Sequence, residues 1–240
     1  MKKITPILLA YLFVSLSVTA QVLPKGTLFF DQLLEYQLVE VDGTKSNIQL
    51  LLNTKTGMFG FDKNMTTASG WGEDIDFIAA DSIGNFYFYG KDPEAGKMIV
   101  KNYLKDVVPN EKQLLLFKKQ FASHFKPTEK NRKMEGLTVQ SFSSPPDREG
   151  SFEKISFAKV NFNVYPIYLF NTLLGDVKLP GGDRMNFSGM LTTHQLLVES
   201  VLLFPKEKLS SSLKLTFYTP TEYYFETKGY KVLQGNKKSN

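Results

Sequence analysis

The chain has 240 residues, with 29 Lys and Arg against 24 Asp and Glu, and it contains no cysteine. The lack of cysteine excludes disulfide bonds and also a lipid anchor attached through a cysteine thiol. The net charge of +5 is mild and no concentrated basic patch accompanies it, which argues against a nucleic-acid-binding protein.

Residues 1–20 have the layout of a secretory signal peptide. Two lysines precede an apolar stretch, and Val18 and Ala20 are small enough for a signal-peptidase site before Gln21. A transmembrane anchor is the alternative, but the apolar stretch is shorter than the ~20 residues that a helix needs to cross a bilayer. We therefore expect an exported protein that is periplasmic or extracellular after cleavage of the signal peptide. After cleavage it should carry no transmembrane segment.

The first segments after the signal peptide have the pattern of β-strands. Leu34, Tyr36 and Leu38 alternate with polar residues, which is the period of a half-buried strand. Two further apolar runs, at 47–53 and 57–63, flank a short connection that contains turn residues. This arrangement predicts a hairpin.

Residues 82–104 predict a second hairpin. Phe86 and Phe88 share one face of its first strand, while Tyr87 and Tyr89 share the other face. The sequence KDPEAG then supplies turn-forming residues, so the following apolar run can return beside the first strand.

Residues 110–126 change to a helical period. Leu114, Phe117, Phe121 and Phe125 recur at helical spacing, with lysines roughly opposite, and a proline follows directly. The pattern favours a helix that covers one face of the sheet. A helix that lies on a membrane surface is the alternative.

The second half of the chain is less regular. Residues 133–142 and 152–160 predict further strands, and the Ser- and Pro-rich residues 143–151 between them are a possible long loop. A proline near the start and a glycine near the end favour a short helix within 165–176. The segment 192–205 fits either a strand or a helix, and we favour a strand.

Together, these segments predict a single domain over 21–235 that is mainly β, in the α+β class. We expect a strongly curved antiparallel sheet, or half-barrel, that is closed by one or two helices. The short polar end at 236–240 is expected to be a disordered tail.

The stretch from 213 to 233 predicts two short strands broken at Pro220. Because proline cannot donate a hydrogen bond to a sheet ladder, Pro220 should lie at a strand end, a bulge or a sheet edge. Alternation along these strands turns Tyr218 and Tyr224 toward the outer, solvent-facing side. Two interpretations stay open. The outward tyrosines either pair across strands, as aromatic residues on a pleated surface do, or form a contact surface for a partner.

The sequence contains no complete motif for catalysis or metal binding. His124 and His194 are the two histidines, and they form neither an HExxH pair nor another metal-binding spacing. Glu73, Asp74 and Asp76 provide only a fragment of a calcium loop. We expect no cofactor. Carboxylates at distant positions could still combine into a hydrolase site.

Three pieces of the sequence carry a resemblance: VTAQ at the end of the signal, LLEYQL soon after it, and YYFETKGYKVL near the end of the chain. With these, the chain resembles the lipoprotein-carrier-like half-barrel proteins of the bacterial envelope and uncharacterised exported bacterial proteins. The resemblance implies a curved antiparallel sheet wrapped around helices, with an apolar interior that accepts acyl chains. It includes no signature motif, so no functional residue is transferred from it.

We expect a non-enzymatic exported envelope protein that binds an apolar or amphiphilic ligand, such as a lipid or an acyl chain. The alternative is a structural or accessory protein that contacts another envelope protein through exposed aromatic residues. A hydrolase with dispersed carboxylates is the third possibility. The predicted ligand-binding residues are Tyr36, Phe86, Phe88, Phe217, Tyr223 and Phe225, and the predicted partner-contact residues are Tyr218 and Tyr224.

Overall fold

The structure is a computed structural model, and it describes residues 26–64, 74–83, 85–103, 111–128, 131–164, 167 and 194–232. The strands are β1 (Thr27–Val39), β2 (Lys45–Asn53), β3 (Met58–Asp62), β4 (Ile75–Ala80), β5 (Asn85–Asp92), β6 (Gly96–Tyr103), β7 (Lys126–Pro127), β8 (Arg132–Met134), β9 (Leu137–Ser143), β10 (Phe152–Lys159), β11 (Gln195–Phe204), β12 (Leu209–Glu226) and β13 (Lys231–Val232). The helix α2 spans Glu111–His124. Among the described residues, no helix combines the length and the apolar character needed to span a bilayer.

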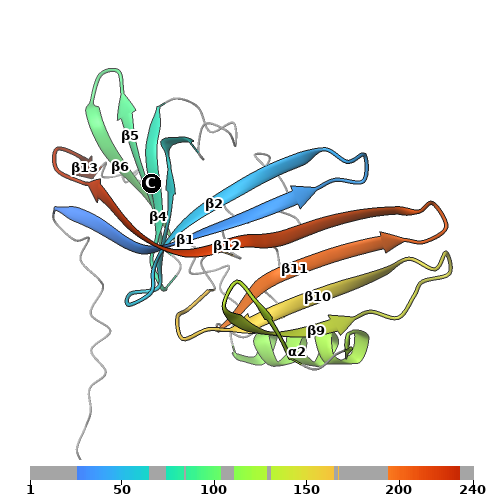
Figure 1. The fold of residues 1–240 in the computed structure, drawn as a ribbon. Coiled ribbons are helices and arrows are strands. Elements are labelled where there is room, and N and C mark those ends of the chain that lie inside the picture. The colour runs from blue at the N-terminus through green and yellow to red at the C-terminus, as the bar shows by residue number, and fades with distance from the viewer. Residues whose placement is uncertain are drawn as a thin grey trace, which may run out of the picture.

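All the strands belong to one strongly curved sheet (Figure 1). Its order is β13-β6-β5-β4-β3-β2-β1-β12-β11-β10-β9-β7, and β8 pairs with β9. The pairs are antiparallel except that of β13 with β6. The structure therefore confirms a mainly β fold with a curved antiparallel sheet and a helix.

The pairing of β1 with β12 joins the two halves of the sheet. This ladder runs from Thr27 opposite Glu226 to Val39 opposite Ser212, and it contains two register shifts. One shift lies beside Pro220. The predicted break into two strands is wrong, because β12 runs continuously through Pro220, whereas the predicted bulge at this proline is confirmed by the register shift.

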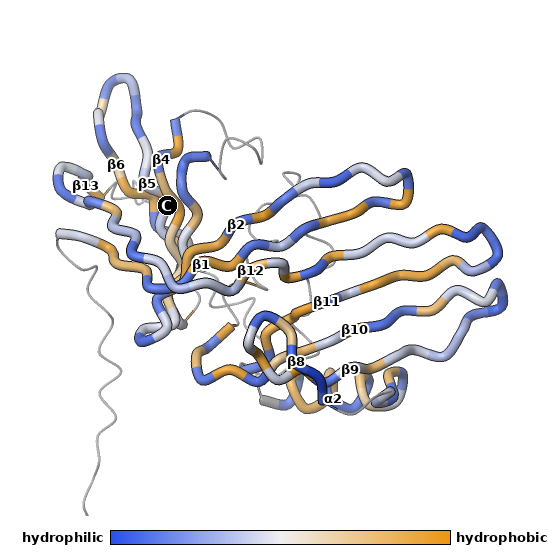
Figure 2. The backbone as a smooth tube through the Cα atoms, in the orientation of Figure 1, coloured by the Kyte–Doolittle hydropathy of each residue, from blue (hydrophilic) through white to orange (hydrophobic). Residues whose placement is uncertain are grey.

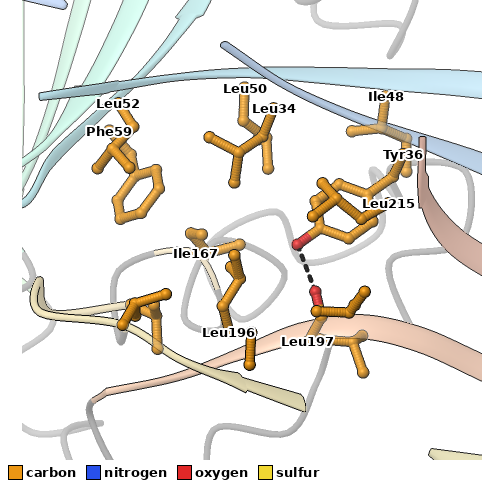
Figure 3. Packing of buried hydrophobic residues seen from close by; sticks show 14 of the residues in the cluster. Leu34, Tyr36, Ile48, Leu50, Leu52, Phe59, Ile167, Leu196, Leu197 and Leu215 are labelled. Carbon is orange, nitrogen blue, oxygen red and sulfur yellow. Dashed lines mark hydrogen bonds between the residues drawn. The ribbon is translucent and has the colours of Figure 1, made fainter. Parts of the chain in front are cut away.

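The first hydrophobic core fills the concave side between β1–β2 and β9–β11. Apolar residues follow both β1 and β11 (Figure 2). Ile167 lies between Leu50 of β2 and Leu196 of β11 (Figure 3). The buried members are Leu34, Tyr36, Leu38, Ile48, Leu50, Leu52, Phe59, Phe61, Ile78, Ala80, Phe86, Phe125, Val139, Ile155, Phe157, Ala158, Val160, Phe162, Val164, Ile167, Leu196, Leu197, Val198, Leu213 and Leu215.

The second core lies on the other face of β2, β3, β4 and β5 and against the N-terminal end of β1. Its buried members are Leu28, Phe30, Leu51, Met58, Phe77, Ala79, Tyr87, Tyr89 and Ile99. After β12, a turn leads the chain to β13, which pairs with β6. The curl of the sheet thus buries both faces of β5, which carries Phe86 in the first core and Tyr89 in the second.

Helix α2 rests on the first core through its C-terminal half. The Phe121 ring lies 4.8 Å from Phe125 and 5.3 Å from Phe142, and it also contacts Phe157 at 6.0 Å. Phe125 is buried, and Lys126 Nζ donates a hydrogen bond to the carbonyl oxygen of Ala122. The predicted helix is confirmed, and so is the contact of its phenylalanine stripe with the sheet.

The other segment predictions have mixed outcomes. The hairpins β2–β3 and β5–β6 and the strand β11 are confirmed. The loop at 143–151 connects β9 to β10, which pair directly across it. The signal peptide at 1–20, the helix within 165–176 apart from Ile167, and the tail at 236–240 lie outside the described residues.

Candidate functional site

Six aromatic rings on the second core form the candidate site, which we call the aromatic cluster. Its members are Phe30 of β1, Phe77 of β4, Tyr89 of β5, Tyr223 and Phe225 of β12, and Tyr230 of the turn before β13. Phe77 and Phe225 stack with ring centroids 4.3 Å apart. Tyr89 meets Phe225 edge-on at 5.1 Å and Tyr230 edge-on at 5.4 Å. These contacts join residues far apart in the sequence.

A glycine on β3 makes room for this packing. A Cβ atom at Gly60 would lie 2.5 Å from Cζ of Phe77 and 2.7 Å from Cζ of Phe30. Both rings are buried directly against the backbone of β3. Glycine within a strand often marks such a close approach, and here it sets the depth of the aromatic cluster.

The ring of Tyr89 contacts Phe77, Phe225 and Tyr230, and its buried hydroxyl group has no hydrogen-bond partner in the protein. Tyr89 is fully buried, and burial raises the pKa of its hydroxyl well above the usual value. By contrast, Tyr87 on the same strand donates to Asp81 Oδ2 at 3.0 Å. A buried polar group without a protein partner is uncommon in native structures and sets Tyr89 apart from Tyr87.

Charged groups surround the outer side of the cluster. Tyr230 donates its hydroxyl proton to Asp76 Oδ2 at 2.7 Å, and Lys91 Nζ lies 3.6 Å from Asp76 Oδ1. Lys97 Nζ lies 4.9 Å from the centroid of the Tyr230 ring, a cation–π distance. Burial, and then the hydrogen bond to Asp76, raise the pKa of Tyr230.

The cluster combines a buried side and an accessible side. Phe30, Phe77 and Tyr89 are fully buried, whereas Tyr223 and Phe225 of β12 and Tyr230 are half-buried. Aromatic edges, three tyrosine hydroxyl groups, two ammonium groups and the Asp76 carboxylate therefore meet in one region. This set can hold an apolar chain or ring together with a polar or anionic head group.

The six predicted ligand-binding residues do not come together. Tyr36 and Phe86 are fully buried in the first core and present no surface to a ligand, while Phe88 packs half-buried against the same core. Tyr223 and Phe225 join the aromatic cluster. Sequence reasoning missed Tyr89, Tyr230 and Asp76 as parts of a site.

Phe217, which was predicted to bind a ligand in the interior of the sheet, instead faces outward, because its side chain is 53% exposed. The outward orientation predicted for Tyr218 is also wrong, because Tyr218 packs against the first core. Burial, and then the negative charge of Asp31, raise the pKa of Tyr218. A register shift between Glu35 and Tyr36 inverts the alternation of β12 at this point and explains both errors.

The other predicted partner-contact residue, Tyr224, does face solvent. It is 61% exposed, and its ring lies 5.0 Å from the ring of Phe29 on β1. Phe29 and Tyr224 are directly opposite in the ladder, so they form the cross-strand pair that was one of the two interpretations. Such a pair leaves the outer surface of Tyr224 available for contact.

A polar cluster on β8–β11 is the other concentration of functional groups. Arg132 forms an ion pair with Glu199 and donates to Ser156 Oγ at 3.3 Å. Ser156 and Ser141 share a buried hydrogen bond of 2.9 Å. These contacts tie β8 across β9 to β10 and β11, so we assign the polar cluster a structural role.

Two other carboxylates accept hydrogen bonds within hairpin turns. Hydrogen bonds from Thr44 lower the pKa of Asp42, and backbone hydrogen bonds from Ala95 and Glu94 lower the pKa of Asp92. Both carboxylates are at exposed hairpin turns. Within the part of the chain that the structure describes, no group of three or more His, Asp or Glu side chains could hold a metal ion.

No family model and no curated protein matches this sequence. Two structures of PNGF-II, in the C2 and P21 space groups, are distantly similar. The first has 11% identity and a TM-score of 0.40, and the match covers 88% of this chain and 31% of PNGF-II. The second has 9% identity and a TM-score of 0.38, with 81% and 29% covered. The chain thus spans less than a third of those proteins, and a likeness of this size establishes no common function.

Proposed function

We propose that the protein is an exported, non-enzymatic protein that binds an amphiphilic ligand at the aromatic cluster. The observation that carries this proposal is the Tyr89 hydroxyl, which is buried among aromatic rings without a hydrogen-bond partner. A buried donor that makes no hydrogen bond costs about 1–3 kcal/mol. A ligand that brings an acceptor to it removes that penalty and gains a hydrogen bond.

The surroundings of Tyr89 indicate the chemistry of the ligand. Its apolar part lies against the half-buried edges of Tyr223 and Phe225. Its polar head offers an ester or carboxylate oxygen to Tyr89, with Lys91 and Lys97 nearby to favour negative charge. Fatty acids and phospholipids combine these two parts. The resemblance to carriers of acyl chains points in the same direction.

Entry of the ligand requires Tyr230 to move. Tyr230 packs edge-on against Tyr89 and is fixed by its hydrogen bond to Asp76. It belongs to a turn beside the two-residue strand β13, which holds to β6 through two residue pairs. Displacement of Tyr230 exchanges one hydrogen bond for contacts with the ligand.

The test is thermal unfolding with and without palmitate or phosphatidylglycerol, because a ligand that binds the folded state raises the melting temperature. Tyr89→Phe should weaken ligand binding by roughly fivefold, because one hydrogen bond to the ligand is lost. It should also leave the empty protein as stable as before or slightly more stable. Tyr36→Phe is the matched control, a fully buried tyrosine of the first core, and it should leave ligand binding unchanged.

Two results would overturn the proposal. One is the lack of a melting shift with any lipid of a broad panel, together with native mass spectra that show no co-purified ligand. The other is a lipid-induced shift that is equal in wild type and Tyr89→Phe, since the lipid then binds without the hydroxyl group.

A second candidate function is that of an accessory protein of the envelope. The observation in its favour is the exposure of Tyr224 and Phe217 on β12. A photo-crosslinking residue at position 224 should then yield a discrete adduct in intact cells. The exposed control position Lys214 on the same strand should yield none. Equal labelling at both positions would contradict a specific contact.

A further inference from the structure

The solvent-facing side of α2 carries two exposed leucines between lysines. Leu115 is 56% exposed and Leu116 is 53% exposed. Lys112 and Lys119 are also exposed and lie within one helical turn of both leucines. We call these four residues the outer face of α2.

The outer face is not needed to hold α2 on the sheet. Phe121 contacts Phe142 and Phe157, and Phe125 is buried in the first core, so the opposite side of the helix makes these contacts. Leu115 and Leu116 therefore present an apolar surface that the fold itself does not use. Covering that surface would be favourable in proportion to the apolar area removed from water.

The charge of this segment selects the kind of partner. Residues 111–126 contain four lysines and one acidic residue, Glu111 at the start of α2. All four lysines are exposed, although Lys126 also donates to the Ala122 carbonyl oxygen. A helix that combines exposed leucines with an excess of lysines is complementary to an anionic lipid surface.

We infer that the outer face of α2 docks on an anionic lipid bilayer. Leu115 and Leu116 enter the boundary between head groups and acyl chains, while Lys112 and Lys119 lie at the level of the phosphates. The helix lies in the plane of the surface, and the sheet that anchors it stays in water. With two leucines and a few lysines, the attachment is reversible and depends on ionic strength.

This inference is independent of the proposed ligand site. The aromatic cluster belongs to β1, β4, β5, β12 and the last turn, and α2 contributes no residue to it. Variants of the outer face therefore leave Tyr89 untouched, and the failure of one proposal can be distinguished from the failure of the other.

The experiment is co-sedimentation of the protein with vesicles of phosphatidylcholine alone and with vesicles that also contain phosphatidylglycerol. We expect binding to the anionic vesicles only, and its loss at high salt. Leu115→Ser with Leu116→Ser should abolish most of the binding. Lys112→Gln with Lys119→Gln should weaken it by roughly tenfold or more, because each lysine adds to the attraction of an anionic surface.

Matched controls distinguish docking through the outer face from nonspecific adsorption through any exposed apolar or basic side chain. Val100→Ser removes an apolar side chain that is 45% exposed on β6, and Lys45→Gln with Lys55→Gln removes two exposed lysines elsewhere. Both control proteins should bind anionic vesicles like the wild type. Circular dichroism and melting should be unchanged for all variants, since the substituted side chains are exposed.

Three results would overturn the inference. The wild type could bind both vesicle types equally or neither of them. The leucine variant could bind as well as the wild type. The lysine variant and its control could lose equal affinity, which would show that the net charge of the protein, and not the outer face of α2, drives the attraction.

Discussion

The hydroxyl group of Tyr36 on β1 donates a hydrogen bond of 2.7 Å to the carbonyl oxygen of Leu197 on β11. This bond crosses the interior of the curved sheet (Figure 3). It fixes how far the two strands stand apart, because both residues are fully buried in the first core. A ring that fills the interior in this way also explains why Tyr36 does not line a ligand site.

Tyr36→Phe should lower the free energy of unfolding by about 1–2 kcal/mol, because a buried carbonyl oxygen loses this donor. Urea unfolding measures the change. Tyr224→Phe removes an exposed hydroxyl from β12 and should stay within about 0.5 kcal/mol of the wild type. Equal stability of the two variants would show that the hydrogen bond adds nothing.

Gly60→Ala should lower the free energy of unfolding by about 1–3 kcal/mol, because the new methyl group overlaps the Phe30 and Phe77 rings. Phe30→Leu removes one of these rings. In a double-mutant cycle, Gly60→Ala should therefore lower the free energy of unfolding by less in the Phe30→Leu background than in the wild type. Additive effects would contradict the overlap.

Phe121→Asp should destabilise the protein by about 2 kcal/mol or more, because it puts a charge among aromatic rings. Leu115→Asp on the outer face of the same helix should change stability by less than about 0.5 kcal/mol. Thermal unfolding compares the two. If Phe121→Asp melts like the wild type, the phenylalanine side of α2 does not support the core.

Stability should fall as the pH rises above about 10, which is the ordinary pKa of tyrosine. Burial raises the pKa of Tyr89, Tyr223 and Tyr230 in the folded protein. The unfolded chain then loses these protons first, so the contribution of the neutral tyrosines is complete below that pH and is lost above it. Melting temperatures measured toward alkaline pH should fall less steeply for Tyr89→Phe with Tyr230→Phe. Parallel curves would contradict this account.

Much of the local structure follows from the sequence. The β5–β6 hairpin is predictable because Phe86 and Phe88 alternate with tyrosines and a turn sequence follows. Asp92 then accepts hydrogen bonds from the turn itself. Helix α2 is predictable because its phenylalanines recur at helical spacing. In both cases the residues that determine the structure are neighbours in the chain.

The face of the sheet to which each side chain of β12 points could not be predicted in the same way. Alternation along β12 is correct up to Leu215, and the register shift against β1 then exchanges the expected positions of Phe217 and Tyr218. The shift depends on the pairing of two distant strands. A similar limit applies to Tyr89, since nothing in β5 indicates that the end of β12 covers its second face.

The pairing of the first strand with the last long strand also shapes how the chain folds. Gly26 and Thr227, 201 positions apart, are joined by hydrogen bonds at the end of the β1–β12 ladder. During synthesis, β1 can form a hairpin with β2, but its other edge has no partner until β12 has been made. Contacts this distant slow folding, because a long loop must close before they form. Until that loop closes, β1 keeps an unpaired edge, and such an edge is prone to pair with a strand of another molecule.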